Sequence, residues 1–396
     1  MTDVRAEVGQ FFNLPIRVQP FRWRRLWSKI EPVISLAKAR GTSAAAVLVA
    51  AAWVASAQTP PGYDWTKLDR ALEAHVGESR AEGGNLFSGI TLMVLHGTPV
   101  VYNKGFGEQT VDSVLPIASA TKMPSALVIL KLVDLHVLDL DRPVGEYLKR
   151  APGFLWPPDK RPITLRMLFN HTSGARAEDP CLSAVRGTLR GCAQQLATLP
   201  LEFAPGTKFA YGSGGMQVAG FVAEAATGRK WNDLFSEYVA RPLKLTRFTY
   251  GRGDNPRIDG GAWSDAGDYL KLLEMFLGGC SFRGVRLLSA ETCSLMGTDQ
   301  VAGVEILRSP AGRLATGYSF GWWHSDSGFL ASQREPRTHG PELSDPGAFG
   351  TTPWVDQGLG YAAVLLVRKN LLSGLELWNE IRPLIIEQIQ KPATKL

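Results

Sequence analysis

The spacing of hydrophobic and polar residues changes along the chain. Short apolar runs typical of strands lie toward both ends, and apolar residues at helical spacing fill the middle. Residues 65–76 carry apolar side chains at helical spacing behind Asp64, a natural helix cap. Residues 90–96 and 100–103 are apolar runs separated by Gly-Thr-Pro, which predicts a pair of strands. After residue 317 the pattern predicts further strands and a last helix, at 318–325, 348–355, 360–367 and 375–390.

The middle of the chain has the spacing of helices. Apolar residues recur at helical intervals in segments bounded by Gly, Pro or capping residues, at 139–148, 164–169, 191–199, 215–227, 231–239, 265–277 and 289–296. Strands at both ends with helices between them predict an α/β (α+β) fold, in which an antiparallel sheet is flanked by N- and C-terminal helices and a mostly helical lobe is inserted. We assign residues 58–116 and 316–396 to the sheet lobe and residues 117–315 to the helical lobe.

The helix that follows residue 117 is apolar on nearly every side as far as Asp134, which predicts a position inside a large domain. Its first turn nevertheless carries Ser119 and Lys122, three residues apart and therefore on one face. A serine nucleophile needs an adjacent base, and the positive end of a helix favours a neutral amine and a developing anion. Ser119 is thus the candidate nucleophile. Ser-x-x-Lys alone is a weak signal, because Ser35 and Lys38 match it by chance.

The net charge of +6 does not indicate a nucleic-acid partner, because the excess is local. Residues 1–57 hold eight basic and three acidic residues, which leaves 35 basic against 34 acidic in residues 58–396. The body of the protein is therefore nearly neutral, and we expect no nucleic-acid binding.

Residues 41–57 have the composition of a secretory signal. An apolar run follows Lys38 and Arg40 and ends in Ala55-Ser56-Ala57, which fits the A-x-A cleavage pattern. The run is short for a membrane span, so we expect cleavage after Ala57, no stable membrane insertion afterwards, and a periplasmic or extracellular protein. An uncleaved membrane anchor is the alternative.

The four cysteines fall into two local pairs without the spacing of a zinc site, so we predict no metal. The sequence contains no phosphate-cradling glycine loop, and we predict no cofactor. In an exported protein, Cys181 and Cys192 are a plausible disulfide that closes a loop. For Cys280 and Cys293 a disulfide competes with free buried thiols.

Two further stretches carry groups that a serine nucleophile requires. Tyr211 lies in a glycine-rich turn before a predicted helix, where its phenol could transfer protons, although an aromatic lid over the core explains it equally well. Residues 344–350 lead into a strand and could supply a backbone amide to an oxyanion.

Taken together, these stretches resemble the serine β-lactamase-like superfamily, which comprises class C β-lactamases, D-alanyl-D-alanine carboxypeptidases and related esterases. The resemblance extends over residues 64–390 and includes residues 163–174, 205–211, 260–269 and 347–356. It implies that Ser119 is acylated, that Lys122 is the general base, and that Tyr211 shuttles the proton. It also implies that the oxyanion hole is formed by the amides of Ser119 and Ala348, with Gly347 in the adjoining strand motif.

Two departures from the superfamily pattern bear on the substrate. Ser213 replaces the asparagine of Tyr-x-Asn and has a shorter reach. Asp345 replaces the cationic or imidazole residue of the Lys- or His-x-Gly motif and would repel a substrate carboxylate, by about 1 kcal/mol at 4 Å in bulk water. This favours a neutral ester or amide over penicillins and D-alanyl termini. Arg337 or His339 could supply the missing cationic or imidazole group in place of Asp345.

Two other motifs fit the chemistry less well. Gly317 to Gly321 match G-x-S-x-G around Ser319, but a strand follows where a nucleophile elbow needs a helix. His171 is more consistent with a residue that braces its loop than with a base.

The leading hypothesis is an exported serine hydrolase that works through an acyl-enzyme on a small ester, an amide or a peptidoglycan-like substrate. The first alternative is β-lactamase or D-alanyl-D-alanine carboxypeptidase activity. The second is a non-catalytic, penicillin-binding-like sensor domain. Nothing in the sequence indicates an oligomeric state.

Overall fold

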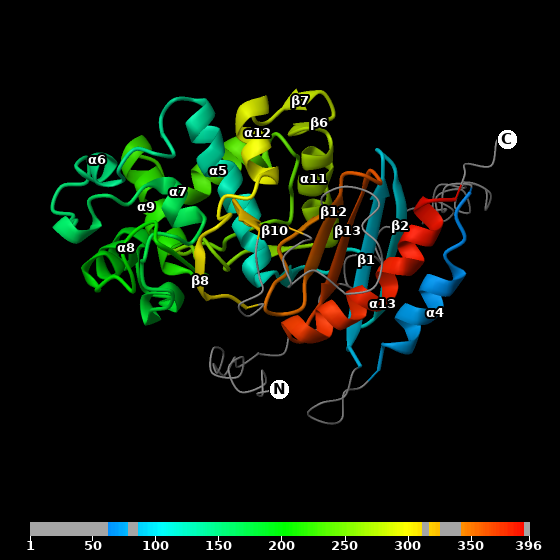
Figure 1. The fold of residues 1–396 in the computed structure, drawn as a ribbon. Coiled ribbons are helices and arrows are strands. Elements are labelled where there is room, and N and C mark those ends of the chain that lie inside the picture. Colours follow the sequence, from blue (N-terminus) through cyan, green and yellow to red (C-terminus); the bar gives the residue numbers. More distant parts are fainter. Residues whose placement is uncertain (1–61, 78–85, 311–316, 325–341, 392–396) are drawn as a thin grey trace, which may run out of the picture. The chain divides into compact units, whose positions relative to one another are not determined.

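The computed structural model describes residues 62–77, 86–310, 317–324 and 342–391. The described residues all belong to one compact unit, within residues 60–396 (Figure 1). The predicted signal segment, Arg337 and His339 lie outside the described residues. None of the helices in the described part is both long and apolar enough to cross a bilayer.

A seven-stranded antiparallel sheet joins the two ends of the chain, as predicted. In spatial order its strands are β2 (Val100–Gly107), β1 (Gly89–His96), β13 (Tyr361–Val367), β12 (Thr352–Asp356), β11 (Glu342–Ser344), β10 (Trp322–His324) and β9 (Tyr318–Ser319). β1 and β13 pair over seven positions, with Leu92 opposite Leu365, and both strands are buried almost throughout. The sheet is therefore covered on both faces.

Each face of the sheet packs into its own apolar core. Along β1, Leu92 and Val94 point to one core and Met93 and Leu95 to the other, the alternation expected of a strand. The first core includes α4 (Thr66–Ala74) and α13 (Leu371–Ile389), which lie side by side against the sheet in Figure 1. The second includes α11 (Ala266–Leu277) and is continuous with the helical region.

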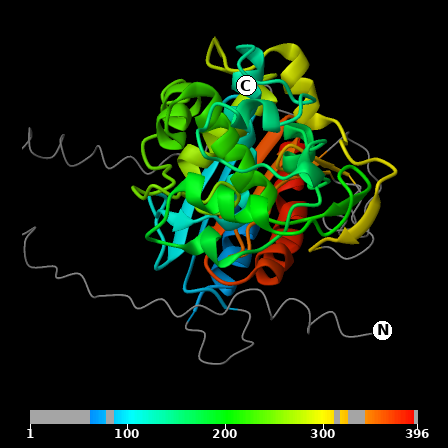
Figure 2. The same ribbon diagram turned by 90° about the vertical axis from the view of Figure 1, so that its left-hand side faces the viewer.

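The helical region, which faces the viewer in Figure 2, contains the helix that carries Lys122. Its main helices are α5 (Lys122–Asp134), α6 (Gly145–Leu148), α7 (Leu165–Phe169), α8 (Leu189–Thr198), α9 (Gly214–Thr227), α10 (Trp231–Phe235) and α12 (Ala290–Gly297). Several begin at a side-chain cap: Thr164 accepts a hydrogen bond from the Met167 N–H, and Thr188 from the Gly191 N–H. α5 is buried nearly throughout, as its apolar sequence predicted.

Three elements differ from the prediction for identifiable reasons. The predicted strand 318–325 is a hairpin of β9 and β10, because Gly321 turns the chain at a φ of +83°. The predicted strand 348–355 begins only at Thr352, because the residues before it form a turn in which Gly350 has a φ of +93°. The predicted helix 139–148 is limited to α6, since the Asp139 side chain accepts a hydrogen bond from the Asp141 N–H and forms a turn there.

Candidate active site

Ser119 lies in a short 3₁₀ helix, η3 (Ala118–Thr121), that runs directly into α5. The residue before it, Ala118, has a φ of +47°, an uncommon conformation for a residue with a Cβ and one often found at functional sites. Ala118, Ala120 and Thr121 are buried, whereas Ser119 is partly exposed. The backbone therefore presents this serine, alone among its immediate neighbours, to the outside of the core.

Lys122 is in direct contact with Ser119. Its Nζ lies 3.1 Å from Ser119 Oγ, and the side chain is only 1% exposed. The same ammonium donates to the carbonyl of Asp259 at 3.0 Å and lies 3.4 Å from Asp259 Oδ2. Burial alone would lower the pKa of Lys122, but its interactions with Tyr211 and with the Asp259 carboxylate outweigh burial and raise this pKa. The resting lysine is therefore an ammonium paired with a carboxylate.

Tyr211 completes the group around Ser119. It follows β4 (Lys208–Ala210), and its N–H donates to the carbonyl of Arg308 at 3.0 Å. Lys122 Nζ lies 4.7 Å from the centre of the phenol ring. Burial raises the pKa of Tyr211, while the Lys122 charge and hydrogen bonding to Ser119 and Lys122 act in the opposite direction. Tyr211 is thus a neutral phenol in contact with both residues of the Ser-x-x-Lys motif.

His171 packs against the ring of Tyr211. The two ring centres are 4.7 Å apart, and His171 Nε2 is hydrogen-bonded to the hydroxyl of Tyr318 at 3.1 Å. Burial, and then the charge of Lys122, hold the pKa of His171 well below its usual range. A neutral, fully packed imidazole fits the bracing role expected from the sequence.

The turn before β12 places a backbone amide beside η3. A Cβ on Gly347 would come within 2.2 Å of the Ile117 carbonyl oxygen and 3.5 Å of the Ala118 Cβ, so only glycine allows this approach. The next residue is Ala348, whose N–H has no hydrogen-bond acceptor among the residues that the structure describes. Ser119 lies in the first turn of η3, where helical amides have no partner within the helix. Both amides expected to form an oxyanion hole are therefore available.

Ser213 belongs to a cluster of charged groups beside Lys122, and no hydrogen bond joins these two residues in the part of the chain that the structure describes. Its Oγ lies 2.6 Å from Asp259 Oδ2 and 2.9 Å from Glu178 Oε1, so its single proton bonds one carboxylate at a time. Arg257 donates from Nε to Asp259 Oδ1 at 2.9 Å and from Nη2 to Ser213 Oγ at 3.2 Å. Asp259 Oδ2 is thus close both to Ser213 Oγ and to Lys122 Nζ, which lies 3.4 Å away.

The burial of Asp345 differs from what its predicted role requires, which was to repel a substrate carboxylate. Its side chain is 0% exposed and faces the first backbone amides of α5, those of Lys122 and Met123, without a well-formed hydrogen bond to either. Burial raises the pKa of Asp345 well above its usual range, against the opposing effect of Lys122. A buried neutral acid does not repel a substrate anion as the sequence suggested. The position still provides no cation to bind one.

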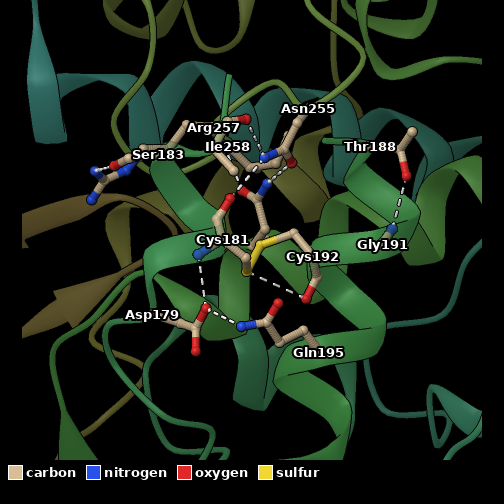
Figure 3. Close-up of a disulfide and its surroundings, with 12 residues drawn as sticks. Asp179, Cys181, Ser183, Thr188, Gly191, Cys192, Gln195, Asn255, Arg257 and Ile258 are labelled. Atoms are coloured by element: carbon tan, nitrogen blue, oxygen red, sulfur yellow. Dashed lines mark hydrogen bonds between the residues drawn. A yellow bond between two sulfur atoms is a disulfide. The ribbon is translucent and has the colours of Figure 1, made fainter. Parts of the chain in front are cut away.

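A disulfide anchors the loop that supplies part of the Arg257 environment. Cys181 is bonded to Cys192, and the Cys181 carbonyl accepts a hydrogen bond from Asn255 Nδ2 at 2.8 Å (Figure 3). In the same loop, Ser183 lies 3.4 Å from Arg257 Nη1. Cys280 and Cys293, for which the sequence left free buried thiols open, are also joined by a disulfide.

The serine of the G-x-S-x-G match is not part of this site. Ser319 is 0% exposed, and its hydroxyl donates to the carbonyl of Met296. In the described part of the chain, no three or more His, Cys, Asp or Glu side chains come together in a group able to hold a metal ion.

Sequence reasoning did not identify Asp259, Arg257 or Glu178. Asp259 is 137 residues from Lys122, and no spacing rule connects them. The available signal was indirect. Asp259 directly precedes Gly260-Gly261, a stretch already part of the superfamily resemblance, and Ser213 has a shorter reach than the asparagine of the superfamily pattern.

The chain is similar to known proteins along most of its described length. The model of the Beta-lactamase family matches residues 68–382. D-alanyl-D-alanine-carboxypeptidase/endopeptidase AmpH of Escherichia coli K12 is 28% identical over 228 residues, which cover 49% of this chain and 58% of that protein. Lovastatin esterase of Penicillium rubens is 33% identical over 180 residues, which cover 37% and 44%. The chain thus matches about half the length of these curated relatives.

Solved structures share the fold over most of the chain. A crystal structure from Bacteroides dorei DSM 17855 has a TM-score of 0.68 at 27% identity and covers 82% of this chain and 99% of that one. EstCE1, described as a hydrolase with promiscuous acyltransferase activity, has a TM-score of 0.64 at 19% identity and covers 82% and 98%.

Proposed function

Because the chain belongs to the Beta-lactamase family, a family of serine hydrolases, we propose that it hydrolyses its substrate through an acyl-enzyme on Ser119. The observation that carries this proposal is the contact of Ser119 Oγ with Lys122 Nζ at 3.1 Å, with Tyr211 against both residues.

Each group has a defined task in the proposed acylation. Lys122 in its neutral form accepts the Ser119 proton while Oγ attacks the substrate carbonyl carbon. The amides of Ser119 and Ala348 stabilise the resulting oxyanion. Tyr211 gives its proton to the leaving alcohol or amine and regains one from Lys122. A water molecule then releases the acid by the same steps in reverse.

The proposed substrate is a neutral carboxylic ester or amide. Relatives that hold a substrate carboxylate use a cationic or imidazole group at the position of Asp345, and here that position holds a buried acid. The similarity to lovastatin esterase also favours an ester.

A D-alanyl peptide or β-lactam substrate is the second candidate, favoured by the similarity to AmpH. Turnover of p-nitrophenyl butyrate compared with trapping of labelled penicillin separates the two. Strong acylation by penicillin would overturn the preference for neutral substrates.

Intact mass after treatment with an activated phosphonate ester tests the acyl-enzyme. We expect one adduct on the wild type, none on Ser119→Ala, and an unchanged adduct on Ser319→Ala, which serves as the matched control. No adduct on the wild type contradicts the proposal and favours the alternative of a binding domain without turnover.

We also propose that the protein is exported and processed after Ala57, because residues 41–57 have the composition of a signal peptide. N-terminal sequencing of the exported protein is expected to begin at Gln58. An intact apolar segment would indicate an anchor instead.

A further inference from the structure

Asp259 holds the side chain of Lys122 from two directions. Its own carbonyl accepts from Lys122 Nζ at 3.0 Å, and its Oδ2 lies 3.4 Å from the same nitrogen. The residue is 2% exposed, so these contacts are screened little by water. The ammonium is thereby kept on the side of Ser119.

Both carboxylate oxygens of Asp259 are themselves fixed. Oδ1 accepts from Arg257 Nε at 2.9 Å, and Oδ2 from Ser213 Oγ at 2.6 Å. Burial alone would raise the pKa of Asp259, but Arg257 and then Lys122 outweigh it and hold this pKa below its ordinary value. Asp259 is therefore a fully ionised, oriented carboxylate.

We propose that Asp259 is a positioning residue for Lys122 and, with Arg257, determines how strongly Lys122 holds its proton. This role rests on the proposed function of Ser119 and Lys122. In this role a carboxylate oriented by Arg257 and Ser213 lies beside the lysine, and Ser213 acts on Lys122 only through that carboxylate.

The charged or titratable groups around Lys122 come from several elements. They are Tyr211, Asp259, Asp345, His171 and Glu178, with Arg257 behind Asp259. Tyr211, His171 and Asp345 are neutral for the reasons given above, and Arg257 lies 3.7 Å from Glu178. Asp259 is therefore the anion in direct contact with the Lys122 ammonium.

Removing the negative charge of Asp259 and removing the positive charge of Arg257 have opposite effects on the pKa of Lys122. In Asp259→Asn the lysine loses its carboxylate, so its neutral form appears at lower pH. An opposite charge this close typically shifts a pKa by roughly one to three units. In Arg257→Gln a nearby positive charge is lost, so the neutral form of Lys122 appears at higher pH.

The test is the pH dependence of Ser119 labelling by the activated phosphonate ester, followed by intact mass. We expect the rising limb of the rate to move down by roughly one unit or more in Asp259→Asn and to move up in Arg257→Gln. Asp134→Asn is the matched control. Its carboxylate lies at the other end of α5, where it accepts from the Ser289 N–H and Thr292, and we expect an unchanged limb.

The outcomes separate the two proposals. If the wild type is not labelled, the proposed function fails. If the wild type is labelled but both variants keep its pH limb, or both move in the same direction, the role of Asp259 is wrong. Should Asp259→Asn fail to fold by near-UV circular dichroism, the direction of the shift in Arg257→Gln decides the matter.

Discussion

Gly347 lies so close to Ile117 that a Cβ on the glycine would come within 2.2 Å of the Ile117 carbonyl oxygen. This contact joins the turn before β12 to the residues that lead into Ser119. It positions the Ala348 amide relative to the nucleophile, because Gly347 also donates from its N–H to the Thr351 carbonyl at 2.8 Å and so fixes the turn from the other side.

Gly347→Ala is therefore expected to damage catalysis more than folding. The added methyl group forces the turn away from Ile117 and moves the Ala348 amide out of the oxyanion position. Loss of one such donor typically lowers kcat by about 100-fold or more. Ester turnover measures the effect. Gly253→Ala, at an exposed glycine whose Cβ would meet nothing closer than 4.0 Å, is the control and should retain activity. Equal activity in the two variants would contradict the assigned oxyanion hole.

Tyr211→Phe removes the hydroxyl of Tyr211 and keeps its aromatic ring, so it distinguishes proton transfer from packing. The ring packs on His171 and Trp323, at 4.7 Å and 5.4 Å between centres, and phenylalanine keeps both contacts. We expect stability to change by no more than about 1 kcal/mol. Loss of proton transfer should lower kcat by about 100-fold or more. Steady-state kinetics and thermal unfolding measure the two quantities. Tyr147→Phe removes a hydroxyl that accepts from the Asp139 N–H and should leave kcat unchanged. If Tyr211→Phe keeps wild-type kcat, Tyr211 is only a lid.

Local spacing was sufficient to predict the part of the site that lies within one turn of helix. Ser119 and Lys122 are three residues apart, so any helix brings them together. The glycine-rich turn before α9 left Tyr211 open between a proton shuttle and an aromatic lid, and only the superfamily resemblance assigned it the first role. The antiparallel sheet was predictable because the strands of both ends have short apolar runs between turns.

Contacts across the fold were not predictable in this way. The burial of Asp345 depends on how the turn before β12 packs against the N-terminus of α5. The split between β9 and β10 depends on Gly321, whose Cβ would come within 2.4 Å of the Met123 nitrogen. The ion pair of Asp259 with Lys122 joins two distant segments, and neither carries a periodic signal.

Reduction of the Cys181–Cys192 disulfide is expected to lower stability and to loosen the Arg257 environment. The bridge closes a loop with a sequence separation of 11, and chain-entropy arguments give about 3 kcal/mol for a loop of this size. The double variant Cys181→Ser/Cys192→Ser should therefore unfold at lower denaturant concentration. Ser183 lies in this loop and Glu178 lies just before it, and both contact Arg257. Loss of the bridge should therefore disturb Arg257 and lower the phosphonate-labelling rate as well.

The other disulfide provides the control for this experiment. Cys280→Ser/Cys293→Ser removes a bridge of similar separation, 13 residues, that has no contact with Arg257 among the described residues. It should lower stability by a similar amount without changing the labelling rate in the folded protein. Equal effects of both double variants on labelling would show that the first disulfide has no specific connection to the site.

Glu342 gives the stability of the sheet lobe a pH dependence that is independent of catalysis. Burial raises the pKa of Glu342 to about 7, with a smaller contribution from Asp356 and an opposing one from Arg382, to which it is ion-paired. The folded state then binds this proton more tightly than the unfolded state, whose glutamate has an ordinary pKa near 4.5. The stability contributed by the proton is fully present below pH 4.5 and is lost as pH rises to about 7. The slope is at most about 1.4 kcal/mol per pH unit.

Urea unfolding at several pH values in this window should show that slope in the wild type and in the exposed control Glu376→Gln, but a smaller slope in Glu342→Gln. If all three proteins share one slope, Glu342 titrates at its ordinary pKa in the folded protein.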